Sequence, residues 1–416
     1  MSETDVIVIG AGAAGLSGAR ALMAAGLSVQ VIEADTQIGG RAKTDTAIFG
    51  VPYDLGAHWL HSAESNDFAA YGRLQGFDIY PAPEAGVMYV GDRPATGAER
   101  TAFRKASDRA RKAISQAGAA GRDVAAADVI APSPEWGASV DWMLGAYEMG
   151  IDTDGLSCVD WYSVEGGADA YCRQGFGALL AHSARDMAVT LNTPAQALRW
   201  SGPGVEVTTP RGVIRARAAL VTVSIGVLAS GAIRFDPALP PSHEAALGGL
   251  EMGHYNHVAL RFSHDVTGIG TDGFFSFRVE ADANGIPQGF GGLIDAGGTG
   301  ISYFDLGGRL AKSLSQAGPG AASDYVIDRL TRIFGAGIET ALLGHHSHDW
   351  SAHPLTRGAY AVARPGHAQA RKPLHDPVGE RIWFAGEALS PRKWATVAGA
   401  HESGRSAAAG MIAALA

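Results

Sequence analysis

Short hydrophobic runs separated by glycines open the chain. Residues 5–10 (DVIVIG) form a β-branched run that is typical of a parallel strand buried on both faces. A helical stretch follows to about Ala25, with Gly26 placed as its C-cap, and residues 28–33 (SVQVIE) form a second strand-like run. The pattern predicts one complete βαβ unit.

A helical period replaces this pattern in residues 99–117, which predict an amphipathic helix. Its apolar face is formed by Phe103, Ala106, Ala110, Ala113 and Ile114. Arg and Lys side chains lie mostly on the opposite face. A docking site for an acidic partner is one interpretation, but a solvated helix face is a much commoner reason for such a charge run.

Strand-like runs return further along the chain. Residues 187–228 contain several short β-branched runs, and a second strand-rich block covers residues 255–306, with a turn at Asn284–Gly285. A last strand over residues 382–385 precedes a helix that begins near Val397. This order predicts a discontinuous dinucleotide domain into which other segments are inserted.

Composition narrows the function classes. A length of 416 residues predicts two domains, and 33 basic against 42 acidic residues without a basic cluster argue against a nucleic-acid partner. Cys158 and Cys172 are the only cysteines, which argues against a disulfide framework. No signal-peptide pattern precedes the first strand, and the Ala-rich residues 406–416 are too short to span a bilayer. We therefore expect a cytoplasmic protein that does not enter a membrane.

The turn after the first strand has the spacing GxGxxG. Gly10 permits a tight bend, Gly12 lets the backbone approach a pyrophosphate, and Gly15 lets the helix, which also contains Ala14, pack closely on the strand. The N-terminus of that helix offers free N–H groups to phosphate. Glu33 ends the second strand, where a carboxylate accepts hydrogen bonds from a ribose diol and disfavours NADP. This unit predicts a dinucleotide but leaves FAD and NAD open.

Four further segments separate these two cofactors. They are Gly39-Gly40-Arg41, residues 53–61 (YDLGAHWLH), residues 350–360 (WSAHPLTRGAY) and residues 383–404, which contain Gly386-Glu387. Together with residues 235–240 (FDPALP), they resemble, in order and spacing, the motifs of the flavin-containing amine oxidase superfamily, in particular the polyamine and spermine oxidases. The resemblance covers nearly the whole chain and implies FAD as the cofactor.

The resemblance also implies which residues contact FAD. Besides the residues of the glycine turn and Glu33, they are Gly40, Arg41, Gly56, Ala57, His58, Trp59, Ala195, Trp350, Gly386, Glu387, Thr396 and Val397. Arginine suits the pyrophosphate because its guanidinium is permanently charged and binds oxyanions in a bidentate manner. Ala359 stands where the monoamine oxidases carry the cysteine that tethers the flavin, so we expect noncovalent FAD.

The family fold implies an α/β architecture, in which a Rossmann-type FAD-binding domain carries an inserted α+β substrate domain. We expect the FAD-binding domain in residues 1–80, 165–235 and 345–416. Residues 81–164 and 236–344 are then expected to form the substrate domain, with helices flanking a mixed sheet.

Three residues are candidates for catalysis by this resemblance. Tyr360 matches one member of the aromatic pair that flanks the amine in monoamine oxidases, and Trp394 is the nearest replacement for the other, whose place is taken by Thr396. His257 stands where the family has a lysine linked through a water to flavin N5. A histidine can still donate to that water, and the alternative is a histidine with only a structural role.

Two groups of histidines remain. His58 and His61 are candidates for the substrate channel, together with Tyr360 and Trp394, although either histidine could instead be structural. The His345-His346-Ser-His348 run has the residue types of a metal site, but a strand there would split its side chains between two faces, so we expect no metal.

The predicted reaction is FAD-dependent oxidation of an amine C–N bond. A hydride equivalent moves from the carbon beside nitrogen to flavin N5, which leaves an imine and, with dioxygen as acceptor, hydrogen peroxide. A polyamine-type substrate is favoured. The alternatives are an L-amino-acid oxidase, a flavin dehydrogenase or desaturase that does not use oxygen, and a FAD-binding protein without turnover.

Overall fold

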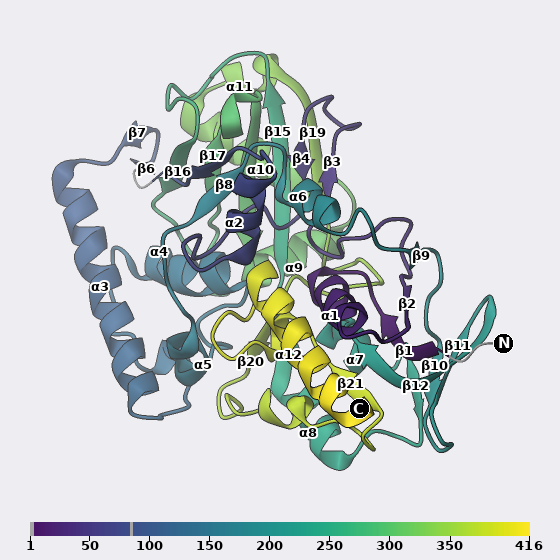
Figure 1. Cartoon of the computed structure of the whole chain (residues 1–416). Helices are drawn as coiled ribbons and strands as arrows, with labels where there is room; N and C mark the ends of the chain where they lie inside the picture. Colours follow the sequence, from purple (N-terminus) through teal and green to yellow (C-terminus); the bar gives the residue numbers. More distant parts are fainter. Residues whose placement is uncertain (1–3, 84–85) are drawn as a thin grey trace.

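The structure is a computed structural model that describes residues 4–83 and 86–416, and two large sheets dominate these residues (Figure 1). In the described part, eight strands form the first sheet, in the order β13-β10-β11-β12-β1-β2-β9 with β21 paired to β12. Their bounds are β1 Thr4–Ile9, β2 Val29–Ile32, β9 Val189–Thr190, β10 Ala197–Arg199, β11 Val205–Thr209, β12 Gly212–Val221, β13 Arg234–Asp236 and β21 Ile382–Phe384.

The βαβ unit predicted at the N-terminus is confirmed. β1 and β2 are parallel, and α1 (Ala13–Ala24) connects them. Alternate residues of β1 enter two separate cores, since Val6 and Val8 pack on the side of α1 whereas Ile7 packs on the opposite face. Gly26 has a φ of +87° and follows the helix end, as a C-cap glycine should.

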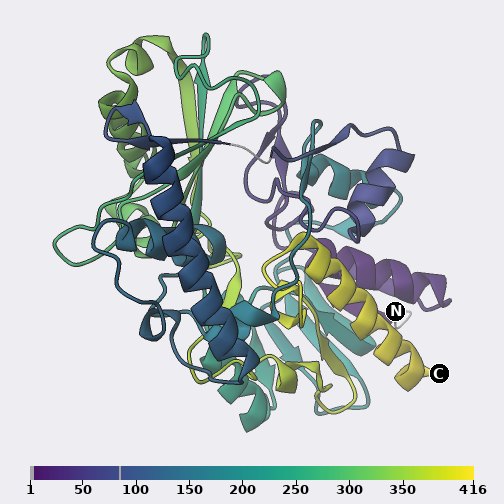
Figure 2. The same ribbon diagram turned by 90° about the vertical axis from the view of Figure 1, so that its left-hand side faces the viewer.

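Helix α12 (Val397–Leu415) lies against α1, so the two ends of the chain pack together (Figures 1 and 2). Glycines make this contact close. A Cβ on Gly404 would lie 2.1 Å from the carbonyl oxygen of Ala14, and one on Gly18 would lie 3.1 Å from the carbonyl oxygen of Gly404. The close packing therefore fixes the middle of α12 against the first turns of α1.

Seven strands of the described chain form the second sheet, in the order β19-β15-β18-β17-β16-β6-β7. Its core side packs on α9 (Gly308–Ala317), α10 (Ala321–Phe334) and α11 (Gly337–Ala341). Val258 and Leu260 of β15 point to that side, so the residues between them in the strand face the first sheet's domain. The strands are β6 Gly86–Val90, β7 Arg93–Pro94, β15 Tyr255–Phe262, β16 Gly273–Phe277, β17 Gly291–Ile294, β18 Ile301–Gly307 and β19 Leu342–His348.

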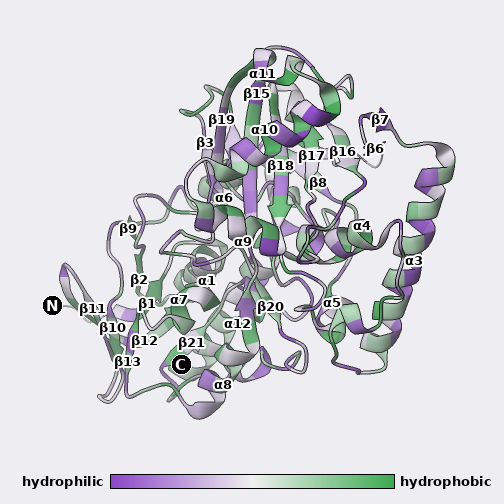
Figure 3. Cartoon of the chain, turned by 180° about the vertical axis from the view of Figure 1, so that it is seen from behind, coloured by the Kyte–Doolittle hydropathy of each residue, from purple (hydrophilic) through white to green (hydrophobic). Residues whose placement is uncertain are grey.

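The predicted amphipathic helix is confirmed as α3 (Gly97–Ala119), which runs along one flank of the molecule (Figure 2). Its start is fixed by a capping box between Thr96 and Glu99. Hydrophilic and hydrophobic positions alternate along it (Figure 3). Ala106, Ala110 and Ile114 are among its buried residues.

Shorter elements complete the fold. Three two-stranded sheets pair β3 (Thr44–Asp45) with β4 (Tyr53–Asp54), β5 (Ile79–Pro81) with β8 (Ala170–Cys172), and β14 (Leu250–Met252) with β20 (Ala361–Ala363) in the described residues. The short helices are α2 Asp67–Leu74, η1 Ala126–Asp128, α4 Gly137–Asp141, the π-helical turn η2 Trp142–Tyr147, α5 Cys158–Ser163, α6 Phe176–Ser183, α7 Ile225–Ala229, α8 Pro241–Gly249, η3 Ala296–Gly298, η4 Lys372–His375 and η5 Glu387–Leu389. No helix of residues 4–83 and 86–416 has the length and apolarity needed to cross a membrane.

Two features differ from the sequence prediction. The apolar run that was predicted as strand up to residue 228 ends at Val221, and α7 follows because Ser224 caps it by accepting a hydrogen bond from the Val227 N–H. Strand β19 pairs with β15 in the second sheet, although its residues 345–348 were assigned to the FAD-binding domain. The turn at Asn284–Gly285 is confirmed and lies in the connection from β16 to β17.

Two glycines of α12 should respond oppositely to alanine. We expect Gly404→Ala to lower the free energy of unfolding by about 1–3 kcal/mol, because its Cβ overlaps the backbone of α1. Gly410 is exposed, and a Cβ there would lie no closer than 3.5 Å to its nearest neighbour, Trp383 Nε1, so Gly410→Ala should gain up to about 1 kcal/mol. Urea denaturation measures both. Equal stability of Gly404→Ala and the unmodified chain would contradict the close packing.

Candidate active site

The glycine-rich turn is built so that side chains are excluded from it. Gly10 has a φ of +108°, and a Cβ on Gly15 would lie 1.9 Å from the Gly10 carbonyl oxygen. Ala14 is buried in the first turn of α1. Gly39 donates its N–H to the Ala11 carbonyl at 2.9 Å, so the Gly39-Gly40-Arg41 segment lies directly beside the turn. The structure therefore brings these two predicted cofactor segments together.

Glu33 lies at the edge of the same turn. Its carboxylate accepts hydrogen bonds from the Ala11 N–H at 2.6 Å and the Asp35 N–H at 2.9 Å. These bonds fix the side chain and still leave lone pairs for the hydroxyls of a ribose. The Thr193 N–H donates to the Glu33 carbonyl at 2.7 Å, which draws the segment that contains Ala195 to the end of β2.

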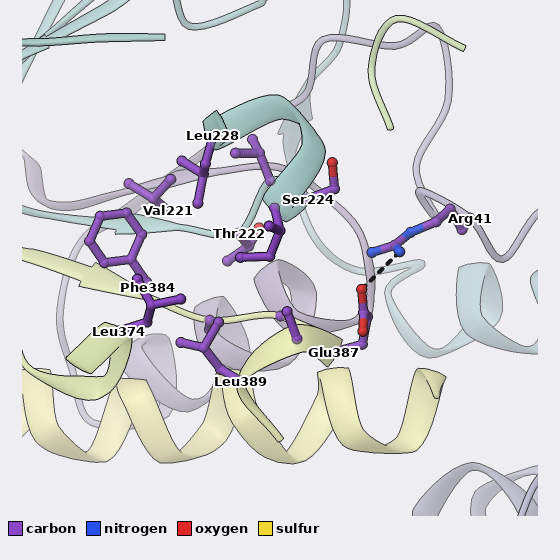
Figure 4. A pocket seen from close by; sticks show the side chains of 14 residues that line it. Arg41, Val221, Thr222, Ser224, Leu228, Leu374, Phe384, Glu387 and Leu389 are labelled. Atoms are coloured by element: carbon purple, nitrogen blue, oxygen red, sulfur yellow. Dashed lines mark hydrogen bonds and ion pairs between the residues drawn. The ribbon is translucent and has the colours of Figure 1, made fainter. Parts of the chain in front are cut away.

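Glu387 joins several distant segments. Its buried carboxylate pairs with the Arg41 guanidinium at 2.9 Å and accepts the backbone N–H groups of Ala361 at 3.1 Å and Ala395 at 3.0 Å. Arg41 also donates to the Ala359 carbonyl. In Figure 4 the Arg41 and Glu387 side chains point toward each other at one end of a cavity. The cavity continues between the carboxyl ends of β12 and β21, where its lining is apolar: Val221, Leu228, Leu374, Phe384 and Leu389.

Gly56 and Ala57 are held against Arg41 from the other side. Ala57 donates its N–H to the Arg41 carbonyl at 3.1 Å, and a Cβ on Gly56 would lie 2.5 Å from that oxygen. The buried Trp350 indole donates to the Leu55 carbonyl at 3.1 Å and closes the remaining space above Gly56. Trp350 thus positions the segment that is predicted to face the flavin.

The N-terminus of α12 points toward the same junction. Thr396 caps the helix by accepting the Gly399 N–H at 2.9 Å, and Val397 is the first helical residue. Gly386 has a φ of +154°, and Ala395 has a φ of +64°, a conformation that residues with a side chain adopt rarely. The Glu387 carboxylate accepts the Ala395 N–H and so helps to hold this backbone.

The second sheet presents a buried polar pair to this domain. His257 on β15 lies directly opposite Asp305 on β18, and His257 Nδ1 is 2.6 Å from Asp305 Oδ1. Both side chains are almost fully buried. Burial on its own raises the pKa of Asp305, but the interactions with His257, His58 and Tyr255 together outweigh burial and lower the pKa overall. Asp305 is therefore a buried carboxylate that stays ionised.

His58 and Tyr303 complete this cluster. The ring centroids of His58 and His257 are 4.7 Å apart, and Tyr303 lies 4.4 Å from His257 and 5.1 Å from His58. Burial, together with the neighbouring His257, lowers the pKa of His58 to about 3. His58 is therefore neutral at physiological pH.

Aromatic side chains surround the cluster. A second cavity on this face is lined by His58, Tyr80, Tyr171, Tyr303 and Arg173, among others. The Arg173 guanidinium lies 4.6 Å from the Tyr80 ring centroid. Trp59 stacks on Phe274 and on His61, whereas His61 itself is half exposed and pairs with Asp169 at 3.3 Å. His58 is thus in the buried wall, and His61 lies further out.

The predicted aromatic pair of Tyr360 and Trp394 is not formed ring to ring. Tyr360 instead packs on Tyr255, with centroids 5.9 Å apart. Trp394 donates its Nε1–H to Ser163 Oγ at 3.0 Å, and the Arg371 guanidinium lies 4.8 Å from its ring centroid. Thr396, which takes the place of the second aromatic residue of the pair, uses its hydroxyl to cap α12. Trp394 therefore has structural partners, and Tyr255 is the aromatic neighbour of Tyr360.

Two functional candidates were missed from sequence. Asp305 stands alone in an apolar strand (ISYFDLG), and Tyr255 is two residues before His257 on the same strand face. A charged residue inside an otherwise hydrophobic run is the signal that could have singled out Asp305. The histidines of β19 form no cluster of three or more metal-ligating side chains within the described residues.

Comparisons with known proteins agree with this geometry. A family model described as flavin containing amine oxidoreductase matches residues 79–412, and one described as NAD(P)-binding Rossmann-like domain matches residues 8–73. The chain is 29% identical to a probable polyamine oxidase 4 of Arabidopsis thaliana, over 97% of this chain and 86% of that protein. It is 27% identical to polyamine oxidase 4 of Oryza sativa subsp. japonica, over 98% of this chain and 88% of that protein.

Among solved structures, the fold is similar to that of a putrescine oxidase bound to putrescine. The TM-score is 0.81 with 20% sequence identity, and the match covers 99% of both chains. The predicted α/β fold, with a Rossmann-type domain and a second domain built on a mixed sheet, is confirmed.

The ion pair between Arg41 and Glu387 should serve both folding and cofactor retention. Arg41→Ala leaves a buried carboxylate without its cation, so we expect a loss of about 1.5–3 kcal/mol of stability together with loss of bound flavin. The double variant Arg41→Ala, Glu387→Gln removes the unpaired charge and should recover most of the stability without recovering flavin. Urea denaturation and the flavin absorbance of the purified protein measure the two effects. Full flavin content in Arg41→Ala would show that Arg41 does not hold the cofactor.

Proposed function

The chain belongs to the flavin-containing amine oxidoreductases, and we propose that it uses noncovalent FAD to oxidise a polyamine-type amine with dioxygen. The observation that carries the proposal is the position of Asp305, a buried carboxylate next to two histidines and several aromatic rings. A buried negative charge in an aromatic wall suits a cationic, otherwise apolar ligand. Relatives named as polyamine oxidases support the same substrate class.

The residues present fit a dinucleotide flavin. The turn at Gly10 and Gly15 leaves no space for a Cβ but exposes backbone N–H groups at the start of α1, and Arg41 supplies a cation beside it. Noncovalent binding is supported by Ala359, which offers no thiol at the position where the monoamine oxidases carry a cysteine. We assign Gly40, Gly56, Ala57, Gly386 and the N-terminus of α12 to contacts with FAD.

Tyr360 connects the two sides of the site. It precedes Ala361, whose N–H binds the Glu387 carboxylate, and its ring packs on Tyr255 of β15. Burial raises its pKa, and the charges of Asp305 and Glu387 add to that rise. Its hydroxyl therefore stays protonated and its ring presents a flat wall to the substrate. We assign Tyr360, Tyr255 and His58 to the substrate site, with His61 nearer its entrance and Trp394 supporting it through Arg371.

Bound flavin supplies the acceptor for the hydride equivalent that leaves the carbon beside nitrogen. The contribution of this chain is to exclude water and to hold the amine in its reactive form. An amine must lose its proton before its carbon can give up a hydride. The aromatic wall around Tyr303 and Tyr171 disfavours a charged amine, whereas Asp305 attracts the cation into the site.

An amino-acid oxidase is the main alternative, and it needs an arginine free to pair with the substrate carboxylate. Arg173 lines the second cavity, but it already pairs with Asp78 at 2.8 Å and donates to the Gly297 carbonyl. A guanidinium that already forms an ion pair is a poor partner for a further carboxylate. The geometry therefore favours an amine without a carboxylate. A cytoplasmic location stays a prediction from sequence.

Anaerobic reduction of the bound flavin tests the substrate class. We expect polyamines to bleach the visible absorbance of the flavin faster than monoamines, and amino acids not to bleach it, because the buried site carries a negative charge. Admission of air should restore the absorbance and release one hydrogen peroxide per amine oxidised. Bleaching by amino acids alone would overturn the substrate class, and reoxidation without peroxide would indicate a dehydrogenase or desaturase.

A further inference from the structure

Among the described residues, His348 Nε2 on β19 is a buried imidazole nitrogen without a hydrogen-bond partner, and two more lie in adjacent rings of the proposed active site. They are Nε2 of His257 and Nε2 of His58, both with less than 1 Å² exposed to solvent. Their rings are neighbours, with centroids 4.7 Å apart. Leaving a polar atom unpaired in a protein interior costs about 1–3 kcal/mol, so two such atoms in adjacent rings indicate a site for a hydrogen-bonding ligand.

The partners of the other ring nitrogens determine what this ligand must be. The ionised carboxylate of Asp305 can only accept, so His257 Nδ1 carries a proton and donates it over 2.6 Å. In neutral His257 the Nε2 atom is then an acceptor. His58 is neutral, and its Nδ1 faces the Gly56 carbonyl at 3.4 Å, which assigns the Nδ1 proton and makes its Nε2 a second acceptor whenever His257 is in its neutral form. Two adjacent acceptors match a group that has several N–H donors.

We propose that His257 and Asp305 act as a dyad in which His257 Nε2 takes the proton of the bound substrate ammonium, with Asp305 as the positioning residue. This inference rests on the proposed function, because it assigns a task to these residues in amine oxidation. His257 is the catalytic residue of the pair, since it touches the amine. Asp305 fixes its tautomer and compensates the charge that develops on the ring.

Protons and electrons balance in this scheme. The N–H bond of the ammonium breaks, a proton moves to His257 Nε2, and the imidazolium forms beside the Asp305 carboxylate. The neutral amine lone pair then assists loss of hydride from the adjacent carbon to the cofactor, which leaves a protonated imine. Dioxygen, the proposed acceptor, removes the two electrons, and the His257 proton leaves with the peroxide product or through water.

The groups that face His257 come from three strands, β19, β18 and β4, and from the segment that follows β4. His348 on β19 is its cross-strand neighbour on one side, and Asp305 and Tyr303 on β18 lie on the other. Tyr53 on β4 lies 6.3 Å away, centroid to centroid, and His58 follows that strand. Burial lowers the pKa of His348 to about 4, and burial also keeps Tyr53 and Tyr303 protonated by raising their pKa. Asp54 on β4 is a second buried carboxylate near His257, and burial raises its pKa, whereas burial lowers the pKa of His346 on β19. Asp305 is the carboxylate that is hydrogen-bonded to His257, so it compensates the charge of a protonated His257 most directly.

The tautomer of His257 is the first test, and it does not depend on turnover. Histidine ¹⁵N shifts of the flavin-loaded protein identify which nitrogen carries the proton, and the His257 signals are those that disappear in His257→Gln. We expect the Nδ1–H form in the unmodified protein and a mixture of tautomers in Asp305→Asn. An Nε2–H form of His257 in the unmodified protein would overturn the dyad.

The second test is the pH profile of anaerobic flavin reduction at saturating amine. Asp305→Asn should slow reduction roughly 10- to 100-fold at neutral pH and move the acidic limb of the profile to lower pH, because the protonated imidazole loses its buried counter-charge. His257→Gln should abolish that limb. Asp305→Glu keeps a carboxylate and should restore the limb in part. Flavin content and the unfolding midpoint check that each variant is folded.

Asp67→Asn is a matched control. It removes a carboxylate from another histidine, His401, which lies 3.1 Å away in an exposed pair outside the site, so the profile should not change. An unshifted profile in Asp305→Asn, with normal reduction by amines, would overturn the dyad alone. If no amine reduces the flavin of the unmodified protein, the proposed function fails, and the proton-accepting role fails with it.

Discussion

The carboxylate of Glu387 is the interaction on which the arrangement of the site depends. It receives the Arg41 guanidinium, the Ala361 N–H and the Ala395 N–H, so one buried group connects segments that are more than 340 residues apart in sequence. Each partner belongs to a different part of the predicted cofactor site. Because the carboxylate is buried, the loss of any of these donors would leave its negative charge without enough hydrogen bonds, which costs free energy. The three segments are therefore held in one relative position.

The rest of the site follows from that junction. Arg41 holds Gly56 and Ala57 through its carbonyl, and the chain continues from there to His58, which enters the aromatic wall. From Ala361 the chain leads back to Tyr360, whose ring meets Tyr255 on β15. Two connections thus lead from the cofactor side to the face of the second sheet that carries the His257–Asp305 pair. The proposed active site is therefore an interface between two sheets, and the contacts of Glu387 hold its segments together.

The sequence was sufficient to predict those elements whose conformation depends only on neighbouring residues. The βαβ unit, the glycine turn and α3 follow from spacing alone, because period and backbone conformation are encoded within a few residues. Glu387 and His257 were found through motif resemblance. Asp305 was missed because its partner, His257, lies 48 residues away on a neighbouring strand. The register between two strands cannot be predicted from the spacing of residues within one of them. The partners of Trp394 could not be predicted for the same reason, since Ser163 and Arg371 come from distant segments.

The most direct measurement is a crystal structure of the flavin-loaded protein with a diamine that carries α,α-dimethyl groups and so has no hydrogen to transfer beside nitrogen. The account predicts the flavin ring between the Gly56-Ala57 segment and Tyr360, with the amine nitrogen within hydrogen-bonding distance of His257 Nε2. A flavin ring that lies away from this face, or an amine nitrogen bound by a different carboxylate, would contradict the central claim that the two sheets form one amine-oxidising site.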